Sequence, residues 1–204
     1  MLTNQYKSGF GRLINPLALA LVRLGVTPLV ITIGGVGLVA ASCAYLVLTR
    51  RVFTFCLLVT LATLCDALDG AVARAGQRTT RFGSYLDAMC DRYGESLVII
   101  SVAWVTGYWL PSLLALSGAL LVSYAKARAA MEVQTSNTEW PDLMERTERD
   151  TFYIVGLAVS QFWHATWLGR DLFWWTLVAF AGLTHLTVWQ RMLRARRLIA
   201  TRSR

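Results

Sequence analysis

The sequence contains few cysteines, and their arrangement excludes two classes of small protein. No two of them form a Cys-x-x-Cys pair, and all lie in apolar segments. They are Cys43, Cys56, Cys65 and Cys90. A disulfide framework or a structural zinc site requires a spaced set of paired cysteines, so neither is expected here. We predict that these thiols pack as small apolar side chains.

Charged residues are also scarce, and lysine is nearly absent. Charged residues make up 16% of the 204 positions, and Lys7 and Lys126 are the only lysines. The net charge of +8 could indicate a nucleic-acid partner. However, 55% of the residues are hydrophobic and collect in runs of about twenty, which a soluble nucleic-acid binder would not need. We therefore predict an all-α integral membrane protein, surrounded by membrane lipids and without a nucleic-acid partner.

The apolar runs predict six membrane-spanning helices, each close to the roughly 20 residues that a bilayer requires. The expected spans cover about 27–49, 52–74, 82–106, 110–133, 151–168 and 172–192. Before them, residues 5–23 place apolar side chains at helical spacing among polar ones, which favours an amphipathic helix in the membrane interface. Pro16 disfavours one straight helix there. We expect one membrane domain over 1–204, with 1–25 as a juxtamembrane helix and 26–204 as the six-helix bundle.

The distribution of basic residues predicts the orientation of these spans. If both termini are cytoplasmic, sixteen basic residues lie on the inner side, and only Arg50, Arg51 and Arg170 lie on the outer side. Basic residues near membrane helices favour the cytoplasmic side. We therefore expect a multi-pass protein of the cell (inner) membrane with both termini in the cytoplasm.

Five acidic residues lie inside the second and third predicted spans, where lipid disfavours them. They are Asp66, Asp69, Asp87, Asp91 and Glu95. An ionisable side chain at the centre of a membrane helix costs about 2.5–3.5 kcal/mol, so four lipid-facing aspartates would cost roughly 10 kcal/mol. These side chains must face the protein interior, and positive charge must compensate them.

The spacing of the four aspartates predicts a metal site. Asp66 and Asp69 are three residues apart and Asp87 and Asp91 are four apart, so each pair lies on one face of its helix. The short link 75–81 makes the two helices antiparallel neighbours, which brings both pairs to one depth in the cytoplasmic half of the membrane. Hard divalent ions take oxygen ligands and leave positions open for phosphate. Two such ions could clamp the reacting oxygens of a phosphoryl transfer.

Gly70 and Arg74 distinguish this prediction from a proton or cation path, which would also use inward-facing aspartates. A glycine inside a helix costs about 1 kcal/mol relative to alanine, so close approach of a ligand or of another helix must explain Gly70. Arg74 lies one turn further along and can pair with a diphosphate. An ion path requires neither residue. A transporter or lipid-binding protein is kept as the non-enzymatic alternative.

The residues singled out so far belong to one spaced pattern. It runs Asp66-x-x-Asp69-Gly70-x-x-Ala73-Arg74, then eight residues, then Gly83-x-x-x-Asp87-x-x-x-Asp91. The pattern resembles the signature of the CDP-alcohol phosphotransferase family at every defined position, and the layout of the spans resembles that family too. The resemblance implies a homodimeric enzyme with two Mg²⁺ or Mn²⁺ ions per active site, which opens to the cytoplasm. Such an enzyme transfers the phosphatidyl group of CDP-diacylglycerol to an alcohol and releases CMP.

The resemblance also implies roles for individual residues. The metal ligands would be Asp66, Asp69, Asp87 and Asp91. Asp91 would in addition be the general base that takes the proton of the acceptor hydroxyl. The CDP-lipid would be bound by Thr27, Pro28, Leu29, Val30, Gly70, Arg74, Thr80 and Gly83.

Two further segments indicate which alcohol accepts the phosphatidyl group. Residues 123–129 and 145–149 resemble segments of bacterial phosphatidylinositol-phosphate synthases, although Ala130 and Thr147 stand where Glu and Pro are common. Carried over by position, the acceptor phosphate would be bound by Ser123, Lys126, Arg149 and Arg191. This favours inositol 1-phosphate as the acceptor. Glycerol 3-phosphate is the main alternative, because it would need the same cations, and uncharged acceptors such as inositol, serine or choline come next.

A competing interpretation of these cations is that they only anchor the protein. Lys126 and Arg191 could extend to the lipid headgroups as positive-inside anchors. The resemblance favours the binding role for both, together with Arg149. For the arginines of 194–197 we expect the anchoring role.

Overall fold

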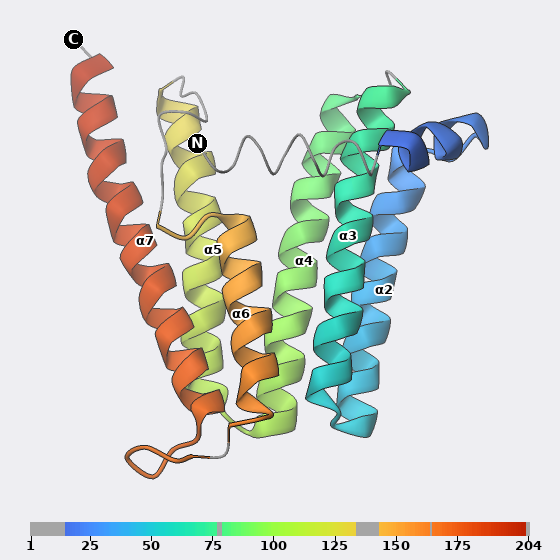
Figure 1. Ribbon diagram of the computed structural model, residues 1–204. Coiled ribbons are helices and arrows are strands. Elements are labelled where there is room, and N and C mark those ends of the chain that lie inside the picture. Colours follow the sequence, from blue (N-terminus) through green and yellow to red (C-terminus); the bar gives the residue numbers. More distant parts are fainter. Residues whose placement is uncertain (1–14, 77–78, 134–142, 164, 203–204) are drawn as a thin grey trace. The chain divides into compact units, whose positions relative to one another are not determined.

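The computed structural model describes residues 15–76, 79–133, 143–163 and 165–202, without the side chains of Asp66, Ala67 and Arg202. Within these ranges the chain is helical apart from short links and one isolated β-bridge. Figure 1 shows the helices α2 Pro28–Thr49, α3 Val52–Ala75, α4 Arg81–Thr106, α5 Trp109–Glu132, α6 Arg146–Ser160 and α7 Leu172–Arg202. The prediction of an all-α protein is confirmed.

Four of the helices are long and apolar enough to cross a membrane, as judged over the described residues: α2, α3, α5 and α7. α4 carries Asp87, Asp91, Arg92 and Glu95, and these charged residues interrupt its apolar run. The 15 residues of α6 span roughly 22 Å, less than the hydrocarbon core of about 30 Å. The chain is a multi-pass membrane protein, and the count of six spans stays a prediction.

The fifth predicted span, 151–168, differs from α6 at both ends. The side chain of Glu145 accepts a hydrogen bond from the backbone of Glu148, and Glu148 Oε2 accepts one from the N–H of Glu145 at 2.8 Å. This capping box starts the helix before the apolar run begins. At the other end, the N–H groups of Gln161 and Phe162 donate to carbonyl oxygens three residues earlier, at 3.2 Å and 3.0 Å, so the helix ends at Ser160 in a tighter turn. Local polar and turn chemistry therefore decides both ends of α6.

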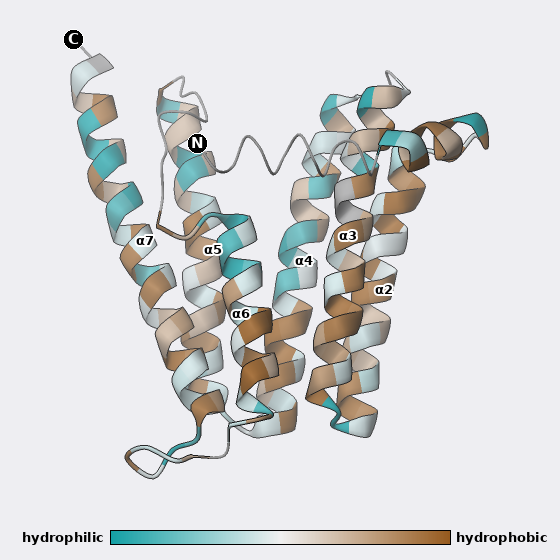
Figure 2. Ribbon diagram, in the orientation of Figure 1, coloured by the Kyte–Doolittle hydropathy of each residue, from teal (hydrophilic) through white to brown (hydrophobic). Residues whose placement is uncertain are grey.

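The last helix is also longer than predicted. α7 continues to Arg202, whereas the apolar pattern predicts an end near 192. Figure 2 shows hydrophilic residues recurring toward the C-terminal end of α7. Arginine is a good helix former, so the helix continues after the apolar run has ended.

The contacts group the chain into two compact units, and the first contains the predicted metal site. It holds Met1–Tyr45 together with Leu57–Leu97, and so most of α2, the C-terminal part of α3 and the first part of α4. Residues 15–23 are helical, and their Ala18 belongs to one buried cluster with Val72 of α3. The earlier part of the predicted interfacial helix lies outside the described residues.

The second unit holds Leu46–Cys56 with Val98–Arg204, and in it α7 packs against α5 and α6. A Cβ on Gly118 of α5 would lie 2.3 Å from Oγ1 of Thr184 in α7. A Cβ on Gly156 of α6 would lie 2.4 Å from another threonine side chain of α7. Glycines at these crossings allow the close approach on which helix association in membranes depends.

Candidate functional site

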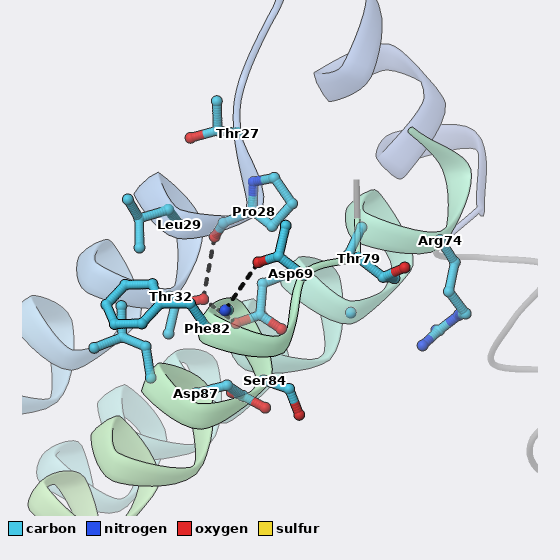
Figure 3. Close-up of a pocket in the computed structure, with 15 residues that line it drawn as sticks. Thr27, Pro28, Leu29, Thr32, Asp69, Arg74, Thr79, Phe82, Ser84 and Asp87 are labelled. Atoms are coloured by element: carbon cyan, nitrogen blue, oxygen red, sulfur yellow. Dashed lines mark hydrogen bonds between the residues drawn. The ribbon is translucent and has the colours of Figure 1, made fainter. Parts of the chain in front are cut away.

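A cavity of about 400 Å³ lies in the first unit, where the N-terminal ends of α2 and α4 meet the C-terminal part of α3 (Figure 3). Its lining residues are Thr27, Pro28, Leu29, Thr32, Asp69, Gly70, Ala73, Arg74, Thr79, Thr80, Phe82, Gly83, Ser84, Leu86 and Asp87. The short link between α3 and α4 brings the two halves of the sequence motif together. The cavity therefore joins two of the predicted metal ligands with most of the predicted CDP-lipid residues.

Two helices begin at this cavity, and each begins with a threonine cap. Oγ1 of Thr27, which precedes α2, accepts a hydrogen bond from the N–H of Val30 at 3.4 Å. Oγ1 of Thr80, which precedes α4, accepts one from the N–H of Gly83 at 2.9 Å. Pro28 occupies the first helical position of α2, where an N–H is not needed. Helix N-termini carry partial positive charge and free N–H groups, so two of them favour an anionic ligand such as a diphosphate.

Asp69 of α3 presents a buried carboxylate to the cavity, with 7% of its surface exposed. Oγ1 of Thr32 in α2 donates a hydrogen bond to its Oδ2 at 2.6 Å. Asp87 of α4 is half-buried and lines the same cavity. Carboxylate oxygens are the ligands that Mg²⁺ and Mn²⁺ prefer. The donor chemistry of the cavity therefore fits a divalent ion held by Asp69 and Asp87.

The other two predicted ligands are not part of this lining. Asp66 lies in α3 one turn before Asp69, but its side chain lies outside the described residues. Asp91 is half-buried in α4, and Glu95 forms an ion pair with Arg92. Among the side chains that are described, no three acidic, histidine or cysteine groups gather closely enough to hold an ion by themselves. The complete set of four aspartates stays a prediction.

Both glycines of the motif make room for a polar side chain at the cavity. A Cβ on Gly70 would lie 3.2 Å from Nη1 of Arg74, so the glycine allows this arginine to fold back along α3. Arg74 is exposed in the last turn of α3 and lines the cavity. A Cβ on Gly83 would lie 2.9 Å from Oγ1 of Thr80. The neighbour that Gly70 accommodates is therefore Arg74 of its own helix, and the approach of a ligand stays a prediction.

Of the eight predicted CDP-lipid residues, only Val30 is absent from the lining, and it is 60% exposed on α2. Five lining residues were not singled out from the sequence: Thr32, Thr79, Phe82, Ser84 and Leu86. The last four are direct neighbours of Thr80, Gly83 and Asp87 in the sequence, and this proximity could have indicated them. Thr32 carried no such signal, because its partner Asp69 is 37 residues away.

The predicted acceptor residues all lie in the second unit. Arg149 and Arg191 are buried, with 2% and 5% of their surfaces exposed. Arg191 donates a hydrogen bond from Nη1 to a backbone carbonyl of α5. Ser123 and Lys126 are half-buried on α5. An anchoring arginine would extend to the headgroups, so the burial of Arg191 argues against the anchoring interpretation.

Related proteins align with this sequence over most of its length. Residues 25–189 match the family described as CDP-alcohol phosphatidyltransferase. The phosphatidylinositol phosphate synthase of Mycobacteroides abscessus is 34% identical over 190 residues, which cover 90% of this chain and 83% of that protein. The archaetidylinositol phosphate synthase of Methanothermobacter thermautotrophicus is 31% identical, with 93% of this chain and 92% of that protein covered.

Solved structures extend the similarity to the fold. The crystal structure of Mycobacterium tuberculosis phosphatidylinositol phosphate synthase with CDP-DAG bound matches at a TM-score of 0.78 and 30% identity, covering 90% of this chain and 94% of that chain. The same enzyme in complex with manganese and citrate also matches at 0.78 and 30% identity, covering 90% and 88%. The chain therefore belongs to the CDP-alcohol phosphatidyltransferase family.

Proposed function

We propose that this protein transfers the phosphatidyl group of CDP-diacylglycerol to a hydroxyl of inositol 1-phosphate and releases CMP. The observation that carries the proposal is the cavity that combines two capped helix N-termini with Arg74 and with the carboxylates of Asp69 and Asp87. A pyrophosphate beside a divalent ion needs these kinds of group. Several relatives are phosphatidylinositol phosphate synthases, and one of them was solved with CDP-DAG bound, which supports this substrate.

The metal ligands in this proposal are Asp66, Asp69, Asp87 and Asp91, which would hold two Mg²⁺ or Mn²⁺ ions. Manganese in the related crystal structure supports a divalent ion. When bound, such ions neutralise the pyrophosphate and the charge that develops on the leaving CMP. The contribution of this chain is to hold the carboxylates on α3 and α4, two helices that are joined by a short link.

The reaction itself requires positioning and one proton transfer. The N–H groups at the starts of α2 and α4, together with Arg74, would hold the pyrophosphate. Asp91 would accept the proton of the acceptor hydroxyl. The hydroxyl oxygen forms a bond to the lipid-side phosphorus, while the bond from this phosphorus to the bridging oxygen breaks and CMP leaves with the electron pair. Orientation of the two substrates supplies much of the rate enhancement.

The acceptor phosphate would be bound by the side chains of Ser123, Lys126, Arg149 and Arg191. Arginine pairs bidentately with phosphate oxygens, and such pairs are strongest where water is excluded. The burial of Arg149 and Arg191 supports this role. Glycerol 3-phosphate would need the same cations, so it is the competing acceptor.

Orientation and assembly complete the proposal. The excess of basic residues near predicted inner ends supports a cytoplasmic position for both termini and for the cavity. We also infer a homodimer in the cell membrane. A protease that removes a C-terminal tag from inverted but not from right-side-out vesicles would agree with this orientation, and the reverse result would contradict it.

An acceptor panel tests the reaction. Purified protein is given CDP-diacylglycerol with inositol 1-phosphate, glycerol 3-phosphate, inositol or serine, and CMP release is measured with Mg²⁺, Mn²⁺ or EDTA. We expect release only with a metal, and fastest release with inositol 1-phosphate. Faster release with glycerol 3-phosphate would reassign the acceptor, and no release with any acceptor would reject the proposal.

The general base is tested by Asp91→Asn, which should lower turnover at least about 100-fold while the protein stays folded. Asp171→Asn is the matched control, because Asp171 Oδ1 caps α7 by accepting a hydrogen bond from the N–H of Trp174 at 2.9 Å. Asparagine caps a helix as well as aspartate does, so the control should keep full activity. Wild-type turnover in Asp91→Asn would reject the base assignment.

A further inference from the structure

One buried side chain at the cavity belongs neither to the sequence motif nor to the reaction described above. Thr32 is the fifth residue of α2, and 9% of its surface is exposed. Its Oγ1 lies 2.6 Å from Oδ2 of Asp69 in α3 and 3.1 Å from the carbonyl oxygen of Pro28 (Figure 3). The hydroxyl thus connects two helices at the carboxylate that the proposed function assigns to the metal.

The two distances show where the hydroxyl proton goes. A hydroxyl has one proton to donate. Hydrogen bonds from hydroxyls to ionised carboxylates are about 2.5–2.7 Å long, whereas 3.1 Å is long for an O–H···O bond. Thr32 therefore donates to Asp69. The Pro28 carbonyl oxygen lies one turn earlier in α2, at the position to which threonine hydroxyls inside helices often donate.

This hydrogen bond occupies one lone-pair site of the carboxylate. An ionised carboxylate has about four such sites on its two oxygens. A donor from a second helix fixes the orientation of the carboxylate, so that the remaining sites keep one direction. Removing a partner that orients a ligating carboxylate typically costs about 10–100-fold in metal affinity or activity.

We propose that Thr32 is a positioning residue of the metal site, whose hydroxyl orients Asp69 for a divalent cation. This inference rests on the proposed function, because Asp69 is a metal ligand only there. Both residues are buried, with 7% of the surface of Asp69 and 9% of that of Thr32 exposed, so water does not readily replace either partner.

Thr176 of α7 shows how a threonine buried for packing alone differs. It is also the fifth residue of its helix, 8% of its surface is exposed, and its Oγ1 donates to the carbonyl oxygen of Leu172 at 2.9 Å. Its hydroxyl bonds within its own helix, whereas that of Thr32 reaches a carboxylate of another helix. Thr176→Val therefore matches Thr32→Val in burial and helix position, and removes a hydroxyl that contacts no carboxylate.

The test compares Thr32→Val, Thr32→Ser and Thr176→Val in the purified full-length protein. Mn²⁺ binding is measured without substrate, from the electron paramagnetic resonance signal of free Mn²⁺. We expect Thr32→Val to weaken binding about 10–100-fold, and Thr32→Ser and Thr176→Val to bind as the wild type does. In the CMP-release assay, Thr32→Val should need more Mn²⁺ for half-maximal rate, and saturating Mn²⁺ should restore most of kcat.

Three outcomes would overturn the proposal. If Thr32→Val binds Mn²⁺ as tightly as the wild type, Thr32 has no positioning role, although the proposed function stands. If Thr32→Ser is as weak as Thr32→Val, the hydroxyl is not the cause. If the wild type binds no Mn²⁺ and releases no CMP, the proposed function fails together with this inference. Should valine prevent folding, Thr32→Ala removes the hydroxyl without adding a methyl group beside Asp69 and gives the same comparison.

Discussion

Substitution of Gly83 by alanine should weaken binding of the CDP-lipid while leaving the fold intact. Gly83 is the third residue of α4, and its N–H donates to Oγ1 of Thr80 at 2.9 Å. The Cβ of alanine would lie 2.9 Å from the same oxygen, a separation that real Cβ atoms essentially never show. The side chain of Thr80 must therefore rotate away, or the first turn of α4 must shift.

The effects on stability and on binding differ in size. Loss of a threonine cap costs about 1 kcal/mol, and alanine in place of helical glycine returns up to about 1 kcal/mol, so the free energy of unfolding should change little. Binding has no such compensation. Thr80 is one of the residues assigned to the CDP-lipid, and a hydrogen bond from its hydroxyl to a charged phosphate would be worth about 1.5–3 kcal/mol. Loss of that bond corresponds to a rise in KM for CDP-diacylglycerol of roughly 10- to 150-fold.

Steady-state CMP release at varied CDP-diacylglycerol in detergent micelles gives KM, and thermal unfolding of the same samples gives stability. Gly94→Ala in the same helix is the control, because its Cβ would make only an ordinary contact, 3.9 Å from Cγ1 of Val39. We expect the control to keep the wild-type KM. A wild-type KM in Gly83→Ala would refute the role of the α4 N-terminus in pyrophosphate binding, and an equal rise in both variants would indicate a general packing defect.

Three further substitutions test separate parts of the molecule. Gly118→Ala would place a Cβ 2.3 Å from Oγ1 of Thr184, so it should destabilise the protein by about 1–3 kcal/mol. Gly182→Ala is the control, because that position has open space around it, and it should not destabilise the protein. Equal unfolding temperatures of the two variants in detergent would contradict this prediction. Arg74→Lys should raise KM for CDP-diacylglycerol about tenfold, because lysine cannot pair bidentately with the diphosphate, and an unchanged KM would remove Arg74 from the site. Arg191→Lys should raise KM for inositol 1-phosphate and leave KM for CDP-diacylglycerol unchanged, and the opposite pattern would exclude Arg191 from the acceptor pocket.

The sequence alone was sufficient for the bounds of the first four long helices. The predicted spans 27–49, 52–74, 82–106 and 110–133 agree within one residue at each end with α2, α3, α4 and α5. The reason is physical: a membrane span needs an apolar run of about 20 residues, so polar residues at the ends of the run mark the ends of the helix. The same reasoning failed for α6 and α7, because a capping box and a tight turn after Ser160 decide the bounds of α6 and an arginine-rich end extends α7.

The sequence also determined which motif residues could share a cavity. Asp69 and Gly70 close one helix and Gly83 and Asp87 open the next, so local helix geometry and a short link bring them together. Helical periodicity is a local property, which is why no structure is needed to see it.

Only the tertiary structure decided which residues of other parts of the chain contact the motif residues. The hydrogen bond from Thr32 to Asp69 joins positions 37 residues apart, and neither the burial of Arg149 and Arg191 nor the exposure of Val30 follows from the spacing of residues along the chain. Such contacts depend on how each helix is rotated about its axis when it packs. A sequence pattern indicates the face that a helix turns inward, whereas the partner on that face is settled by the packing of all the helices together.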